Sequence, residues 1–194
     1  MPNGSHPKAL AAIIWKDAIT DFRDPTLVML QTVFSIGSGL AVGIAARSGI
    51  WGGEPLIVGG VALAMMFQSV FAIHGAILRE VEANSIEALR LAPAPKWLLF
   101  TAKTFYSTAN IFVFTTVFLL ASLLFSQQSL AKTFHATPWL IITSTYLGIV
   151  SSFTGITLIY SQARNTASPA IILALTPPYF YSTVEHLTLL VQGV

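Results

Sequence analysis

Five apolar runs, each about as long as a membrane-crossing helix, constrain the fold of this 194-residue chain more than any other feature. A helix needs about 20 mostly apolar residues to cross the hydrocarbon core of a bilayer. Only 9% of the residues are charged, whereas soluble domains carry about 25%. We therefore predict an all-α polytopic membrane protein in which residues 1–194 form one transmembrane domain. The predicted spans are residues 27–46, 56–78, 97–125, 139–160 and 169–190.

Prolines mark several of the span boundaries and one span interior. Pro55 and Pro138 precede the second and fourth spans, and we expect each of these helices to begin after its proline. The fifth span contains Pro177 and Pro178, which lack backbone N–H donors and should break or kink the helix.

The first 26 residues are not a cleavable signal, because charges interrupt them throughout. Residues 10–22 fit an amphipathic helix, with apolar residues at helical spacing and Trp15 as an interfacial anchor. Lys16, Asp17 and Asp21 fall on its other faces. We interpret residues 1–26 as a cytoplasmic helix lying on the membrane, with a helical juxtamembrane linker as the alternative.

Lys and Arg residues are divided unequally between the two sides of the membrane. With the N-terminus inside, eight of the ten lie on the inner side, and only Arg47 and Lys132 lie on the outer side. Cytoplasmic loops carry an excess of these residues. We therefore expect a cytoplasmic N-terminus and cytoplasmic residues 79–103 and 161–168, with the 47–55 and 126–138 loops outside.

Motifs for catalysis are missing, so we expect no enzymatic activity in this chain. There is no G-x-x-x-x-G-K-[ST] sequence for nucleotide phosphates and no cysteine for a thiolate site. No carboxylate falls at the centre of a predicted span, which argues against a self-powered proton-coupled transporter.

Uncharged and titratable side chains inside the spans leave a few candidate sites. His74 and Gln68 are candidates for substrate binding, although each is also explained by a hydrogen bond to a neighbouring helix, as is Asn110. His135 and His186 fall on the outer side, but their spacing supports no metal or haem site, and we interpret them as interfacial residues.

Small residues recur along one face of the first span. Ser35, Gly39 and Gly43 have four-residue spacing, which permits close helix crossing. The pattern indicates either packing within the chain or a dimer seam.

Residues 79–103 form the one long polar interruption. Asn84 and Glu87 have capping-box spacing, and Pro93 and Pro95 would end the short helix that follows. Residues 79–97 are therefore predicted to form a capped cytoplasmic coupling segment. The alternative is an intracellular turn with no partner.

Residues 85–95, S-I-E-A-L-R-L-A-P-A-P, follow the Arg79-Glu80 pair and precede Lys103. This arrangement resembles the signature after the second span of the CcmB family, the membrane subunit of the cytochrome c maturation ABC transporter. There the stretch is of the type G-[ST]-L-E-x-L-x-L-x-P-x-P. Two departures stand out: the expected glycine is missing, with Asn84 in its neighbourhood, and the family has six spans where five are predicted here. The sixth is either absent from this sequence or supplied by another subunit.

The resemblance implies an ABC-2-type permease fold in the inner (plasma) membrane and a role in haem delivery for cytochrome c biogenesis. It implies a CcmA-like cytoplasmic ATPase as partner, together with CcmC-, CcmD- and CcmE-like proteins, and a homodimer within the complex. Haem would be cargo of the complex, and no cofactor, metal or nucleic acid is expected on this chain. The implied ATPase-docking residues are Arg79, Glu80, Glu87, Leu89, Arg90 and Pro93.

Three alternatives remain. The chain could be an ABC-2-type exporter of another amphiphilic substrate, or a non-transporting membrane scaffold that recruits partners. An enzyme within the membrane is the third.

Overall fold

The computed structural model describes residues 6–23, 25–49, 53–82, 95–129, 131–158, 161, 164–176, 181 and 184–185. Every element in these residues is helical, which confirms the all-α prediction for this part of the chain. The elements are α1 (His6–Arg23), α2 (Thr26–Arg47), α3 (Gly53–Ile73), the π-helical turn η1 (His74–Leu78), α4 (Arg79–Glu82), α6 (Lys96–Ser126), α7 (Ala131–Thr157) and α8 (Arg164–Leu175).

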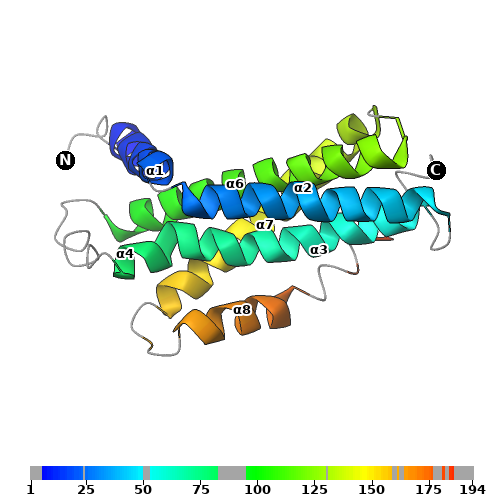
Figure 1. The fold of residues 1–194 in the computed structure, drawn as a ribbon. Coiled ribbons are helices and arrows are strands. Elements are labelled where there is room, and N and C mark those ends of the chain that lie inside the picture. The colour runs from blue at the N-terminus through cyan, green and yellow to red at the C-terminus, as the bar shows by residue number, and fades with distance from the viewer. Residues whose placement is uncertain are drawn as a thin grey trace.

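The long helices form an elongated bundle in which α2, α3, α6, α7 and α8 alternate in direction (Figure 1). Helix α6 has 31 residues and is the longest of the described helices, since each residue adds about 1.5 Å to a helix. It packs against α1, α2, α3 and α7 and is the central helix of the bundle. Helix α1 lies across one end, and α8 packs on α7 and α3.

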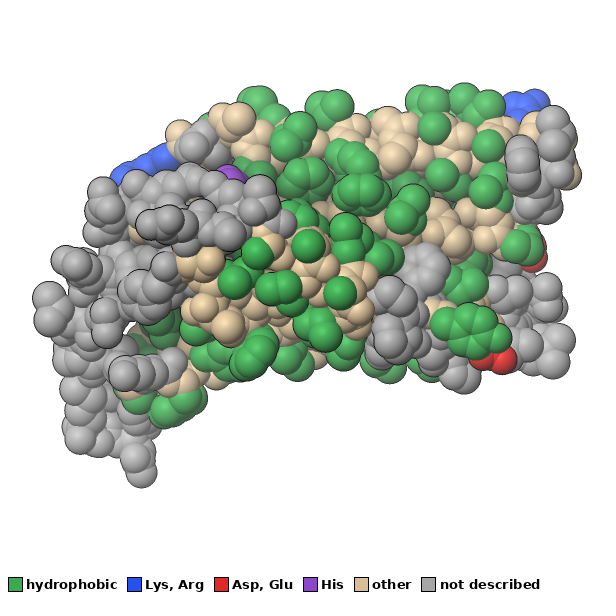
Figure 2. All heavy atoms as spheres, turned by 90° about the horizontal axis from the view of Figure 1, so that it is seen from below, with side chains coloured by type: hydrophobic (Ala, Val, Ile, Leu, Met, Phe, Trp, Pro, Cys, Tyr) green, Lys and Arg blue, Asp and Glu red, His purple; other side chains and the backbone are tan. Residues whose placement is uncertain are grey.

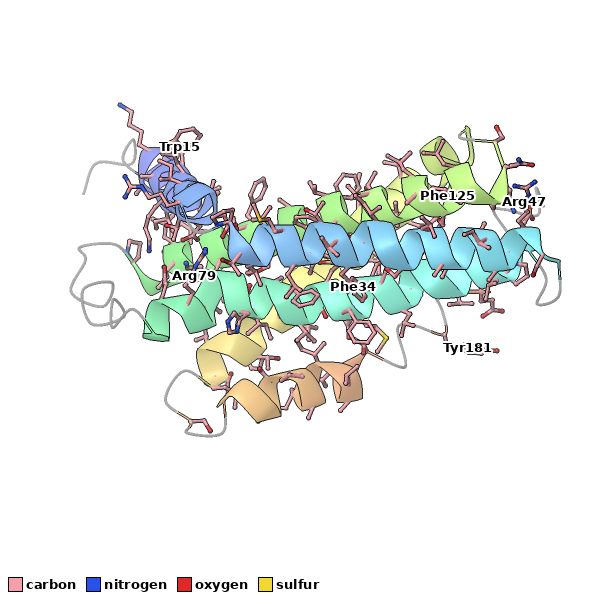
Figure 3. All side chains as sticks on the ribbon, in the orientation of Figure 1. Trp15, Phe34, Arg47, Arg79, Phe125 and Tyr181 are labelled. Carbon is pink, nitrogen blue, oxygen red and sulfur yellow. The ribbon has the colours of Figure 1, made fainter. Side chains whose placement is uncertain are left out.

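Among the described residues, four helices are long and apolar enough to cross a membrane, which supports a multi-pass membrane protein. They are Thr26–Arg47, Gly53–Ile73, Trp97–Ser126 and Ala136–Thr157. Each corresponds to one of the first four predicted spans. Hydrophobic side chains are exposed along the length of the bundle (Figure 2), and Trp15 and Arg79 lie at one end while Arg47 lies at the other (Figure 3).

Two predicted helix starts are wrong. Helix α3 begins at Gly53, so Pro55 lies in its first turn, where the missing N–H has no intrahelical partner to lose. Helix α7 begins at Ala131 and contains Pro138, so the predicted 126–138 loop is much shorter and His135 belongs to the helix. Pro138 removes only one hydrogen bond from a helix of 27 residues, and a long helix tolerates that loss.

The fifth predicted span, residues 169–190, is not present as one long helix among the described residues. Helix α8 starts earlier, at Arg164, contains Pro169 and ends at Leu175. Its 12 residues span only about 18 Å, short of the ~30 Å hydrocarbon core. The helix ends just before Pro177 and Pro178, where the sequence predicts a break; this pair and His186 lie outside the described residues.

Helices α2 and α6 approach closely along the small residues of the first span. A Cβ atom added to Gly39 would lie 2.7 Å from the carbonyl oxygen of Phe118, and one added to Gly43 would lie 2.6 Å from that of Ser122. The alternative of packing within the chain is therefore the one that the structure adopts. On the α3 side of α2, the ring of Phe34 packs against Phe67 and Phe71, with centroid separations of 5.4 and 5.9 Å.

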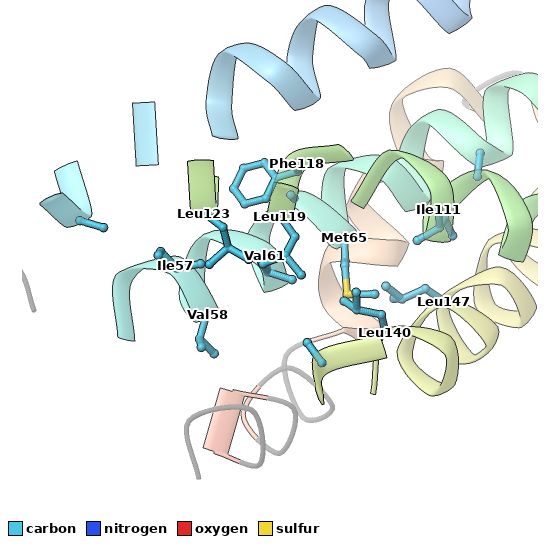
Figure 4. Close-up of a cluster of buried hydrophobic side chains, with 14 residues drawn as sticks. Ile57, Val58, Val61, Met65, Ile111, Phe118, Leu119, Leu123, Leu140 and Leu147 are labelled. Carbon is cyan, nitrogen blue, oxygen red and sulfur yellow. The ribbon is translucent and has the colours of Figure 1, made fainter. Parts of the chain in front are cut away.

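The main apolar core joins α3, α6 and α7, mostly in the half of the bundle away from α1 (Figure 4). Met65 of α3 and Phe118 of α6 are among its largest buried side chains. The half of the bundle next to α1 is more polar. There Gln31 of α2 and Asn110 of α6 exchange hydrogen bonds of 2.8 and 3.3 Å, which confirms the interhelical interpretation of Asn110.

Candidate functional site

The second span continues without interruption into the polar segment. After α3, the five-residue turn η1 widens the helix, and α4 extends it to Glu82. Such π-helical turns are rare and frequently mark functional sites. Here the turn carries the chain from the apolar span to Arg79 and Glu80, the first two predicted docking residues.

Helix α1 presents two carboxylates to this place. Asp17 and Asp21 are four residues apart and therefore share one face of α1. Asp21 accepts a hydrogen bond from the Arg79 guanidinium, which also donates to the carbonyl of Gly75. The side chains of Arg79 and Asp21 are 20% and 13% exposed, so most of this ion pair is shielded from solvent.

Lys103 of α6 lies at the centre of the arrangement. Its Nζ donates to both carboxylate oxygens of Asp17, at 3.0 and 2.9 Å, and to Oε1 of Glu80, at 2.7 Å. Lys103 is 2% exposed and Asp17 is 3% exposed. Lys16, whose side chain is 45% exposed, approaches the same oxygen of Glu80 from the surface. We call these six residues, Lys16, Asp17, Asp21, Arg79, Glu80 and Lys103, the charged junction.

The two carboxylates around Lys103 experience opposite pKa changes. Burial raises the pKa of Asp17 above its ordinary value of 3.8, and Lys103 opposes that rise only in part. Burial would also raise the pKa of Glu80, but the charges and hydrogen bonds of Lys103 and Lys16 outweigh it and bring that pKa below 4.5. The two pKa values change in opposite directions because Glu80 has two lysine partners, whereas Asp17 depends mainly on one.

The charged junction connects helices from three separate parts of the chain. It joins α1, the start of the 79–97 segment and α6, which are far apart in sequence. Its three carboxylates are held by lysine or arginine side chains. Among the described residues no group of three or more metal-ligating side chains is found. The arrangement can hold three helices in a fixed relation and can transmit a displacement from one to the others.

The structure thus brings Arg79 and Glu80 together with α1 and α6. The other predicted docking residues, Glu87, Leu89, Arg90 and Pro93, and the predicted capped helix lie outside the described residues. Docking of a partner on the segment therefore stays a prediction.

The two candidate substrate residues have different environments. Gln68 is fully buried, and its Nε2 donates to Ser35 Oγ at 2.9 Å, which confirms the interhelical interpretation. His74 is exposed at the start of η1.

The sequence places Asp17 and Asp21 on the non-apolar faces of α1, but it does not predict their pairing with Lys103 and Arg79. One signal was available. Lys103 lies several residues inside an apolar run, and a charge at that depth requires a buried partner. Two acids at i and i+4 on a neighbouring amphipathic helix are suitable partners.

Comparison of the chain with known protein families, with curated proteins and with solved structures finds no match.

Proposed function

We propose that this chain is the membrane subunit of an ABC-type transporter that is driven by a separate cytoplasmic ATPase, as the resemblance to the CcmB family implies. In this proposal the 79–97 segment receives the ATPase. The supporting observation is that the segment starts inside the charged junction, where Arg79 and Glu80 are ion-paired to α1 and α6. A push on the segment would therefore move α1, α3 and α6 together.

The role of Arg79 and Glu80 in this mechanism is to position the segment. They are largely buried in ion pairs with the chain's own residues, so they hold the segment against the bundle. Contact with the ATPase then falls to Glu87, Leu89, Arg90 and Pro93. ATP-driven closure of the ATPase would tilt the helices through the junction, and the complex would serve haem delivery with CcmC-, CcmD- and CcmE-like partners, this subunit forming a homodimer.

Copurification tests the docking step. We expect Glu87→Arg to abolish copurification of the ATPase from membranes, because the substitution reverses a charge on the docking segment. The matched control is Glu54→Arg, the same change at the opposite end of the bundle in the first turn of α3, which should retain the ATPase. Equal recovery of the ATPase with both variants, at equal membrane insertion, contradicts the proposal.

The partners recovered in the same experiment separate the alternatives. Haem-handling proteins alongside the ATPase support cytochrome c biogenesis, and an ATPase without them favours export of another amphiphile. Reconstitution separates a scaffold from a transporter, because a scaffold stimulates no ATP hydrolysis coupled to substrate flux.

A further inference from the structure

A set of buried polar atoms in the bundle has no hydrogen-bond partner within the part of the chain that is described. In most helical Ser and Thr residues here the hydroxyl donates to a carbonyl of the preceding turn, as Thr116 does to Phe112 and Thr143 to Trp139. The exceptions are concentrated on α6 and α7. The unpartnered polar atoms of the spans belong to Gln68, Thr104, Ser107, Thr115, Ser144, Ser152 and Thr154.

Two of the exceptions, Thr104 of α6 and Ser152 of α7, lie at the same level of two packed antiparallel helices. A Cβ atom added to Gly148 of α7 would lie 2.2 Å from the hydroxyl oxygen of Thr108 on α6, which fixes the register of the two helices. Counting one turn in opposite directions from this contact puts Ser152 at the level of Thr104. Ser151 donates to the carbonyl of Ser69 at 3.1 Å, which brings α3 to the same level.

Five of these residues, Gln68, Thr104, Ser107, Ser152 and Thr154, lie from the middle of the bundle toward the charged junction. We call them the inner seam. The main apolar core fills the other half, around Met65 and Phe118. The inner seam therefore lies between the main apolar core and the end of the bundle that holds the charged junction.

A buried polar group without a partner destabilises a fold by about 1–3 kcal/mol, and the bilayer offers no water to satisfy it. Alanine or valine would fill the same space without that cost. Gln68, Ser107 and Ser152 are each 0% exposed, so bulk solvent does not reach these groups in this conformation. Their presence is explained if a second conformation hydrates them.

We propose that the interface of α6 and α7 opens toward the charged junction in a second conformation, and that the inner seam then lines a water-filled cavity. The seam contains hydroxyl and amide groups and no charge, so the cavity accepts water and uncharged hydrogen-bonding groups. The proposal does not require the ATPase.

Cysteine labelling in native membrane vesicles tests this directly, because the chain has no cysteine of its own. Single variants Ser107→Cys and Ser152→Cys are exposed to a charged, membrane-impermeant methanethiosulfonate, with and without ATP. A thiol reacts as the thiolate, which forms readily only in contact with water. The controls are Phe153→Cys, at a position that is 63% exposed on the apolar surface, and Leu147→Cys, at a position that is 3% exposed in the apolar core.

We expect the two seam variants to react about tenfold faster than both controls, and from the side of the charged junction. Titration of each variant after denaturation in detergent confirms that equal amounts of thiol are present. Rates equal to the controls, with and without ATP, overturn the proposal, as does access only from the opposite side.

A second measurement does not depend on reactivity. Ser152→Ala removes an unpartnered hydroxyl, so it should raise the melting temperature of the closed form and slow the labelling of Ser107→Cys. A lower melting temperature with unchanged labelling would show that the hydroxyl is structural and would also overturn the proposal.

Discussion

Lys103 is a charged residue inside an apolar helix, 2% exposed, and its environment explains how the chain tolerates it. Asp17 and Glu80 together supply three carboxylate oxygens at 2.7 to 3.0 Å. Buried ion pairs add little net stability over an apolar replacement, but loss of one partner leaves an uncompensated buried charge. Lys103 therefore specifies where α1 docks on α6.

Replacement of this lysine tests that role. We expect Lys103→Met to lower the free energy of unfolding by about 3–5 kcal/mol, because Asp17 would remain buried without its cation. Lys16→Met should lower it by at most about 1 kcal/mol, since Lys16 is partly exposed. Detergent-based equilibrium unfolding measures both, and equal losses for the two variants would show that burial of Lys103 is unimportant.

The opposite pKa changes predict a pH dependence. Glu80, with a pKa below its ordinary 4.5, contributes stability above that value, which is lost as the pH falls through the lowered pKa. Asp17, with a raised pKa, contributes stability that is present below 3.8 and is lost as the pH rises through the raised pKa. As the pH falls, the stability lost through Glu80 is therefore partly offset by the stability gained through Asp17.

The substitution Asp17→Asn removes the pH-dependent contribution of Asp17 to stability. We expect the melting temperature of this variant to fall more steeply than that of the unsubstituted chain as the pH is lowered through 4.5, because only the Glu80 contribution remains. Parallel melting curves across this range would rule out the proposed opposition.

At the scale of the elements, the packing of α2 on α6 depends on two glycines one turn apart. Gly39 and Gly43 face backbone atoms of Phe118 and Ser122 at distances that exclude a side chain. Gly37 lies on the same helix with nothing within 4 Å of its Cβ position. The same residue type therefore has a packing role at two positions and none at the third.

This contrast gives a matched pair of variants. Gly43→Ala should destabilise the protein by about 1–3 kcal/mol, because its Cβ would displace α6. Gly37→Ala should cause no loss, since alanine favours helix and meets no neighbour. Thermal unfolding in detergent compares them, and a loss at Gly37 equal to that at Gly43 would contradict the packing explanation.

The presence of the long helices was predictable from the sequence, but the residues at which they begin and end were less predictable. The four long spans follow from apolar length, and Pro177-Pro178 indicates the end of α8 at Leu175. The predicted starts after Pro55 and Pro138 were wrong, because a single proline does not stop a helix whose other hydrogen bonds are intact. The charged junction was only half predictable, since Arg79 and Glu80 are local to the segment whereas Asp17 and Lys103 meet across 86 residues.

On the scale of the whole molecule, the alternating helices put Arg79 and α1 at one end of the bundle and Arg47 at the other (Figure 3). Eight of the ten Lys and Arg residues belong to segments assigned to the first end. This charge bias predicts that this end of the bundle is cytoplasmic.

Side-specific labelling tests the orientation in intact cells. An impermeant thiol reagent should label Ser48→Cys, at an exposed position just after α2, without permeabilisation. Lys8→Cys, exposed on α1, should react only after the membrane is opened. The reverse pattern would place the N-terminus outside.

Sequence alone was enough to predict a helical membrane protein, four of the five expected spans and the position of the polar segment along the chain. These depend on local quantities: apolar length, charge counts and proline positions. The packing of Gly39 and Gly43 within the chain, the pairing of Lys103 with Asp17 and Glu80, and the burial of unpartnered hydroxyls on α6 and α7 emerge only from the three-dimensional arrangement. Each of these depends on which helix lies beside which, and no local pattern in one helix contains the identity of its neighbour.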